Sequence, residues 1–284
     1  MSGTNVVSFD DATLSRDADV AFVTEEALRA RQRTVPLKDC HVAFDACTMV
    51  MKSKTSHYLL FDKLTATFPK RRRITVLGHK GSGKTVLVDM MLKRRSVTSG
   101  RVIVTSNLSW PVSFIQFLDQ KLTLRQNLIF VARIMGIDAT YLMRLSCEIC
   151  NFQEKQLREP VKNIPAPMKR RIGLLLFLLA DFDCHLIDGK LRPQMFGAQS
   201  DRIDAMVAAV TARDYIAMVT ERRHVPDNCD LAYILYNGRL FAFDDVEEAV
   251  NIYESLPEPE NPNPFTNQDE KDDDGDDSNG FEVM

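Results

Sequence analysis

The sequence contains no apolar run long enough to cross a membrane. The longest wholly apolar run that follows a glycine covers residues 174–180, whereas a membrane-spanning helix needs about 20 residues. The first residues also lack the basic and then apolar pattern of a secretory signal. These absences predict a chain that stays in the cytosol.

Closely spaced cysteines are scarce. Six cysteines are scattered along 284 residues, and only Cys147 and Cys150 form a close pair. That pair lies in an expected helix, with no second pair and no nearby histidine, which disfavours a zinc site. We therefore expect reduced, structural thiols rather than a disulfide framework, a metal site or a redox site.

The body of the chain has no strong excess of one charge. Residues 257–284 hold ten acids and one lysine, a net charge of −9, and since the whole chain carries −3, the preceding residues carry +6. A mildly basic body suits phosphate ligands or an anionic membrane surface, and it is too weak a signal to predict a nucleic-acid partner. The Pro-rich and then Asp-rich residues 257–284 have too little apolar sequence to form a core, so we expect a disordered acidic tail.

One glycine-rich segment stands out, the sequence GHKGSGKT at residues 78–85. An apolar run of strand type precedes it, and apolar residues at helical spacing follow it, so the segment forms a loop between a strand and a helix. Such a loop turns backbone N–H groups toward a phosphate, its lysine reaches the terminal phosphates, and its threonine is placed for Mg²⁺. The residues expected to bind a nucleotide are Gly78, His79, Lys80, Gly81, Ser82, Gly83, Lys84 and Thr85.

The first part of the chain predicts an extension followed by antiparallel strands. Residues 1–40 carry one short expected helix, at 25–33, and no chemical motif. Alternating apolar residues then predict strands at 41–44, 58–61 and 64–68, which form an antiparallel region near residues 41–70.

The middle of the chain predicts helices. Thr123 and Gln126 form a capping box that opens a helix ending at Gly136, and a second helix covers residues 139–150. A basic and then apolar helix at 168–180 follows.

The sequence of the last third of the chain predicts a buried sheet followed by a final helix. Residues 184–188 have the pattern of a buried strand and end in Asp188, which would border the ligand crevice of an open parallel sheet. The remaining expected elements are a strand at 216–220, a hairpin of 232–235 with 240–243 around Asn237 and Gly238, and a helix at 246–254.

Several segments together carry a family resemblance. The glycine-rich loop, LTLRQNLIFVARIMG at 122–136, EPVKNIPAPMKRRIGLLLFLLADFDCHLID at 159–188 and FAFDDVEEAVNIYES at 241–255 resemble the ATP-binding subunits of ABC transporters, nearest the branch that exports capsular and other polysaccharides. The resemblance covers residues 41–256. It implies an α/β fold: a P-loop NTPase core with a mostly parallel sheet, an antiparallel β subdomain, and a helical subdomain at about 122–165.

The resemblance also implies ligands and partners. ATP would be bound with Mg²⁺ held by Thr85 and Asp188, and Gln116 lies near the family's glutamine-loop position. Tyr58 is a candidate for stacking on the adenine ring, although an aromatic residue in an alternating strand is more often part of the core. The expected partners are an integral-membrane permease and a second ATP-binding subunit, in a homodimer or a heterodimer with a competent homologue. The chain would then lie peripherally on the inner face of the cell membrane.

This sequence departs from the family pattern at positions that serve hydrolysis. The family's catalytic glutamate position holds Gly189, and its Ser-Gly signature is replaced by Pro165-Ala166-Pro167. The switch histidine position holds Glu221, with His224 three residues later, and the Gly-Asp loop of this branch falls on residues 194–195. A missing general base or phosphate contact each costs on the order of 10² to 10⁴ in rate.

These departures predict a subunit that binds Mg-ATP but hydrolyses it poorly as a homodimer. The first alternative is a regulatory or structural pseudo-ATPase that pairs with a competent homologue in a polysaccharide export or synthesis assembly. A different class of protein, a phosphate-loop kinase, would need a lid of arginines and an acceptor pocket. Residues 169–171, Lys-Arg-Arg, are more simply explained as the start of a helix.

Overall fold

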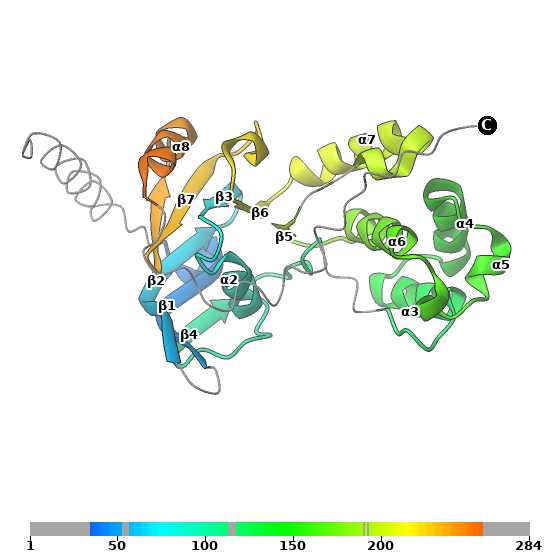
Figure 1. Ribbon diagram of the computed structural model, residues 1–284, viewed down its shortest axis with the longest axis horizontal. Helices are drawn as coiled ribbons and strands as arrows, with labels where there is room; N and C mark the ends of the chain where they lie inside the picture. The colour runs from blue at the N-terminus through cyan, green and yellow to red at the C-terminus, as the bar shows by residue number, and fades with distance from the viewer. Residues whose placement is uncertain (1–34, 53–56, 113–117, 190, 192, 258–284) are drawn as a thin grey trace, which may run out of the picture.

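Figure 1 shows the computed structural model of the protein, which describes residues 35–52, 57–112, 118–189, 191 and 193–257. The helix expected at 25–33, Gln116 and residues 258–284 of the acidic tail lie outside the described residues. Among the described residues, no helix combines the length and the apolar character that crossing a membrane requires.

An antiparallel sheet forms one side of the molecule. Its strands are β1 (Cys40–Lys52), β2 (His57–Pro69) and β4 (Ser99–Val104), in the spatial order β2-β1-β4. The expected break between residues 61 and 64 is wrong, because β2 runs through it, and β1 extends well past residue 44. The reason lies in irregular positions: Ala46 (φ 47°) and Lys63 (φ 49°) adopt left-handed backbone conformations, and the register of β1 against β2 shifts between Phe44 and Cys47. Such bulges disturb the alternation of side chains without ending a strand.

A second, mostly parallel sheet holds the rest of the strands. They are β3 (Arg73–Leu77), β5 (His185–Asp188), β6 (Tyr215–Val219), β7 (Leu231–Tyr236) and β8 (Arg239–Phe243), in the order β5-β6-β3-β7-β8. Only β8 is antiparallel, and it pairs with β7 through the expected hairpin, whose turn residues Asn237 (φ 46°) and Gly238 (φ 71°) are both left-handed. The four parallel strands therefore end at the same edge of the sheet.

The helices of the middle third gather apart from the sheets, in green in Figure 1. They are α3 (Leu124–Met135), α4 (Ala139–Cys150), the short α5 (Glu154–Leu157), the 3₁₀ turn η2 (Val161–Asn163) and α6 (Ala166–Leu179). The predicted capping box of α3 is confirmed, because the Thr123 side chain accepts from the Gln126 backbone and the Gln126 side chain accepts from the Thr123 backbone. The α6 helix starts two residues before the expected position, directly after Pro165.

Two helices were not expected from the sequence, the short α5 and the longer α7. The α7 helix (Ser200–Thr211) follows the 3₁₀ segment η3 (Pro193–Gln199), and it buries only Ile203 and Val210 completely. Its apolar face is too sparse to predict a helix from periodicity. The remaining elements are η1 (Leu37–Asp39), α2 (Lys84–Met91), η4 (Arg222–His224) and α8 (Val246–Ser255).

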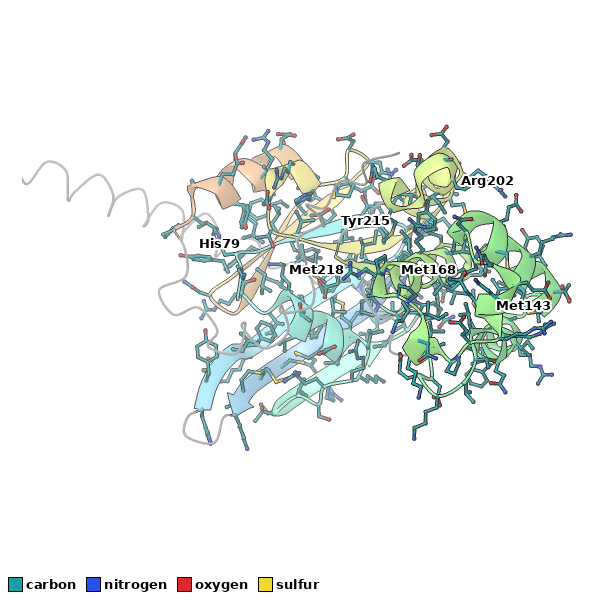
Figure 2. The ribbon with its side chains drawn as sticks, turned by 45° about the vertical axis from the view of Figure 1, so that its right-hand side comes forward. His79, Met143, Met168, Arg202, Tyr215 and Met218 are labelled. Atoms are coloured by element: carbon teal, nitrogen blue, oxygen red, sulfur yellow. The ribbon has the colours of Figure 1, made fainter. Side chains whose placement is uncertain are left out.

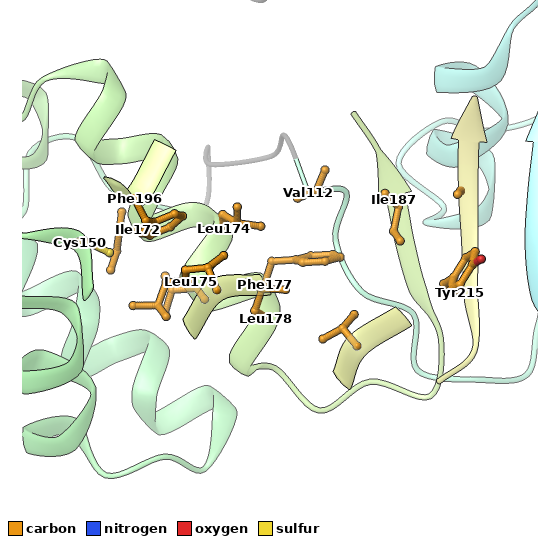
Figure 3. Close-up of a cluster of buried hydrophobic side chains, with 14 of the residues drawn as sticks. Val112, Cys150, Ile172, Leu174, Leu175, Phe177, Leu178, Ile187, Phe196 and Tyr215 are labelled. Carbon is orange, nitrogen blue, oxygen red and sulfur yellow. The ribbon is translucent and has the colours of Figure 1, made fainter. Parts of the chain in front are cut away.

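The parallel sheet is buried on both faces, and each face belongs to a different core. In β6, Ile216 and Met218 pack with β1, β2 and α2, whereas Tyr215, Ala217 and Val219 pack on the opposite side with the helices. Figure 3 shows how apolar side chains of α6 lie between Cys150 of α4 and Ile187 of β5. The α6 helix thus joins the helical group to the sheet.

All six cysteines are free thiols, as predicted. Burial raises the pKa of the Cys150 thiol to about 12. A neutral, buried thiol of this kind is unreactive.

Candidate functional site

The glycine-rich loop leaves the carboxyl end of β3 and leads directly into α2. Gly81 (φ 81°) and Gly83 (φ 100°) both have left-handed backbones, which favour glycine. A Cβ added at Gly78 would lie 2.6 Å from the Ser82 Oγ. Backbone conformation therefore favours glycine at positions 81 and 83, and the close approach of Ser82 favours it at position 78.

Lys84 lies over this loop. Its Nζ donates to the carbonyl oxygens of Gly78, at 2.6 Å, and His79, at 3.0 Å. The Ser82 Oγ is buried and has no hydrogen-bond partner in the protein. A buried hydroxyl without a partner is costly, so the loop suits a ligand whose oxygens accept hydrogen bonds, such as a phosphate.

The strand β2 forms a wall behind the loop. A Cβ at Gly83 would lie 2.9 Å from the Phe61 ring and 3.1 Å from Leu60. Tyr58, further along β2, is partly buried against the core between the sheets, and burial raises its pKa. Its contact with an adenine ring stays a prediction.

The residues expected to hold Mg²⁺ come from adjacent elements. Thr85 is exposed in the first turn of α2, and Asp188 is the half-buried last residue of β5, which α2 contacts. The described residues contain no group of three or more His, Cys, Asp or Glu side chains suited to a metal. A Mg²⁺ ion bound together with phosphates needs only one or two protein ligands, so Thr85 and Asp188 fit that ion.

The backbone conformation at position 189 explains why a glycine stands there. Its φ of 116° is one that residues with a side chain rarely adopt. The position after Asp188 therefore lacks a carboxylate and also has a conformation that disfavours one.

The segment after β6 lies beside the loop. The Gly78 backbone N–H donates to the Val219 carbonyl at 3.1 Å. The Tyr253 hydroxyl of α8 donates to the Thr220 carbonyl at 2.8 Å, while the Tyr253 and His79 ring centroids are 4.8 Å apart. Tyr253 thus contacts both the loop and the segment that follows β6. The sequence showed it only as part of the apolar face of a helix, so its place in the site was missed.

Glu221 is exposed and forms an ion pair with Arg223, at 2.6 Å between Oε2 and Nη2. Burial is the main cause that raises the pKa of Tyr253 to about 12, and the negative charge of Glu221 adds a smaller increase. Glu221 directly follows Thr220, whose carbonyl accepts from the Tyr253 hydroxyl. It is an anion beside the proposed phosphate site.

The segment Pro165-Ala166-Pro167 opens α6 in the helical group. All three residues are exposed, and Pro165 caps the helix without a side-chain hydrogen bond. Prolines have no backbone N–H. This helix end therefore offers fewer donors to a partner's ligand than a Ser-Gly sequence would.

Comparisons with known proteins agree with this geometry. The sequence profile of the ABC transporter family matches residues 61–191. The capsule polysaccharide export ATP-binding protein CtrD of Neisseria meningitidis serogroup B is 30% identical over 199 residues, which are 66% of this chain and 87% of that protein. The polysialic acid transport ATP-binding protein KpsT of Escherichia coli is 25% identical over 75% of this chain and 98% of its own length.

Solved structures with the same fold are also found. The ATP-binding cassette MJ0796, in a dimeric post-hydrolysis state bound to ADP and Pi, superposes with a TM-score of 0.52 at 13% identity, over 72% of this chain and 98% of that one. A bacterial Atm1-family ABC exporter with ATP bound gives a TM-score of 0.56 at 15% identity, over 79% and 42% of the two chains. The α/β fold implied by the sequence resemblance is thereby confirmed, and this chain belongs to the ABC transporter family.

Proposed function

We propose that this chain is the nucleotide-binding subunit of a polysaccharide-type ABC exporter. The observation that carries the proposal is the complete phosphate loop between β3 and α2, with Lys84 folded over it and the Ser82 hydroxyl buried without a partner. Residues 78–85 hold the phosphates of ATP, and Thr85 and Asp188 hold Mg²⁺. When bound, Mg²⁺ neutralises phosphate charge, while the chain's own groups orient the nucleotide.

The substrate class is proposed from the relatives. The meningococcal relative is named for capsule polysaccharide export, and the E. coli relative for polysialic acid transport. Because both relatives are named as ATP-binding proteins of export or transport systems, a separate permease would form the path through the membrane. The chain accordingly works on the inner face of the membrane. Co-expression with the permease of its own transporter, followed by detergent co-purification, tests this part.

We also propose that this subunit hydrolyses ATP poorly. The Gly189 conformation and the Pro165-Ala166-Pro167 helix start support it, since the first cannot orient a water and the second has few donors for a partner's nucleotide. The same two observations support the second candidate function, a pseudo-ATPase that uses bound ATP to regulate a competent partner. Measured turnover separates the two.

The Lys84→Ala variant tests nucleotide binding. A lysine bonded to phosphate oxygens contributes about 1.5 to 3 kcal/mol, so Mg-ATP affinity should fall about tenfold to a hundredfold in calorimetry. Lys155→Ala, an exposed lysine in α5, is the matched control and should bind like the parent chain. Equal affinity of the parent and Lys84→Ala would reject the proposed site.

A further inference from the structure

The segment that follows β6 is held beside the phosphate loop from two sides. On one side, the Val219 carbonyl accepts from the Gly78 N–H. On the other, the Thr220 carbonyl accepts from Tyr253, whose ring contacts His79 of the loop. The next residues, which form η4, are therefore adjacent to the place where a nucleotide's phosphates would lie.

Two arginines in this segment have different roles. The Arg222 guanidinium is fixed on α8, where Nη2 donates to Glu247 at 2.8 Å and Nη1 donates to Glu254 at 3.2 Å and to Asn251 at 3.3 Å. With acceptors on three residues of α8, Arg222 anchors η4 and is not available for a ligand.

Arg223 remains accessible. Its side chain is 73% exposed, and its ion pair with Glu221 at 2.6 Å uses only Nη2. A guanidinium has five N–H donors and can bind two oxyanions at once. Glu221 alone would repel a triphosphate, because like charges at close range are unfavourable, and Arg223 offsets that charge.

We infer that Arg223 contacts the terminal phosphate of bound ATP. It supplies a positive charge to the phosphate, which the neighbouring carboxylate of Glu221 cannot do. This inference rests on the proposed nucleotide site. Arg222 acts as a positioning residue, because it holds η4 on α8.

The inference predicts a change in the preference between ATP and ADP. Because ADP lacks the terminal phosphate, Arg223→Ala should lower Mg-ATP affinity about tenfold, the effect of one charge-assisted hydrogen bond, and change Mg-ADP affinity less than about twofold. Glu221→Gln removes the repelling charge and should raise Mg-ATP affinity. Arg223→Lys should recover part of the loss. Calorimetry with both nucleotides measures each effect.

Arg202→Ala is the matched control, since Arg202 also pairs with a glutamate, Glu148, at 2.6 Å and is also exposed, at 49%. Figure 2 shows Arg202 on α7, well separated from His79. The inference would be overturned if Arg223→Ala left the ratio of ATP affinity to ADP affinity unchanged. That holds whether both affinities fall by the same factor or neither affinity changes. If the parent chain binds both nucleotides through Lys84, the proposed function survives that result; if it binds neither, both proposals fail.

Discussion

At the scale of single residues, His41 joins the two sheets. It lies in β1 with 2% of its surface exposed. Its Nδ1 lies 2.8 Å from the Ser106 Oγ, and its Nε2 lies 2.8 Å from the Asp214 Oδ2, just before β6. Burial lowers the pKa of His41 below its ordinary value of 6.5, although Asp214 acts in the opposite direction.

This pKa shift predicts how stability depends on pH. In the unfolded chain, His41 takes up a proton near pH 6.5, whereas the folded chain resists it. The stabilisation is therefore present above pH 6.5 and is lost as the pH falls toward the lower folded pKa. The free energy of unfolding can be measured with urea at pH 7.5 and at pH 5.5. The difference between the two pH values should be smaller for His41→Asn than for the parent chain. His57→Asn, in an exposed position of β2, should keep the parent's difference; a His41 variant that also keeps it would contradict the assignment.

At the scale of elements, the start of α3 depends on a local hydrogen-bond exchange. The Gln126 N–H donates to the Thr123 Oγ1 at 3.2 Å, and the Thr123 N–H donates to the Gln126 Oε1 at 2.9 Å. Loss of an N-cap side chain costs about 1 kcal/mol. Thr123→Ala should therefore lower the melting temperature by about 2 to 4 °C, and Thr123→Ser, which keeps the hydroxyl, should lower it less. Equal melting temperatures for the alanine variant and the parent would show that the cap adds nothing.

Elements with complete local signals could be predicted from the sequence. The α4 helix matches its expected bounds, and its N-cap Asp138 accepts from the Tyr141 backbone. The β7–β8 turn was equally clear, because Asn-Gly suits a two-residue hairpin. The length of β2 and the α7 helix were not predictable. The bulge at Lys63 breaks the alternation that marks a strand, and α7 buries too few side chains to show a period.

At the scale of the whole molecule, the site was only partly predictable. The loop from 78 to 85 is contiguous in sequence, and its motif dictates its geometry. By contrast, the contact of His79 with Tyr253 and the ion pairs of Arg222 with α8 join residues far apart in the chain. Only the order of strands in the sheet brings such groups together, and no local pattern encodes it.

Nucleotide binding and hydrolysis make different demands on the assembled molecule. Binding needs the loop, Lys84 and a Mg²⁺ ion, whereas turnover also needs a group that orients water and donors from a second subunit. Gly189 offers no such group, and the exposed Pro165-Ala166-Pro167 turn offers few donors. A homodimer would carry both defects in each of its two sites. We therefore expect the purified homodimer to turn over ATP far below 1 s⁻¹, the low end for typical enzymes.

Restoring the missing carboxylate alone should not restore turnover. Because the φ of Gly189 is 116°, any side chain there adds strain of about 1 to 3 kcal/mol, and the partner's donors would still be missing. Gly189→Glu should show little or no gain in ATPase rate and a lower melting temperature, and Gly189→Ala should show the same lower melting temperature without the carboxylate. Mixing the parent chain with a homologue that has the glutamate and the Ser-Gly signature should instead give ATPase activity that Lys84→Ala reduces. Turnover of about 1 s⁻¹ or more by the homodimer alone would contradict this interpretation, and Glu221 would become the first candidate for the base.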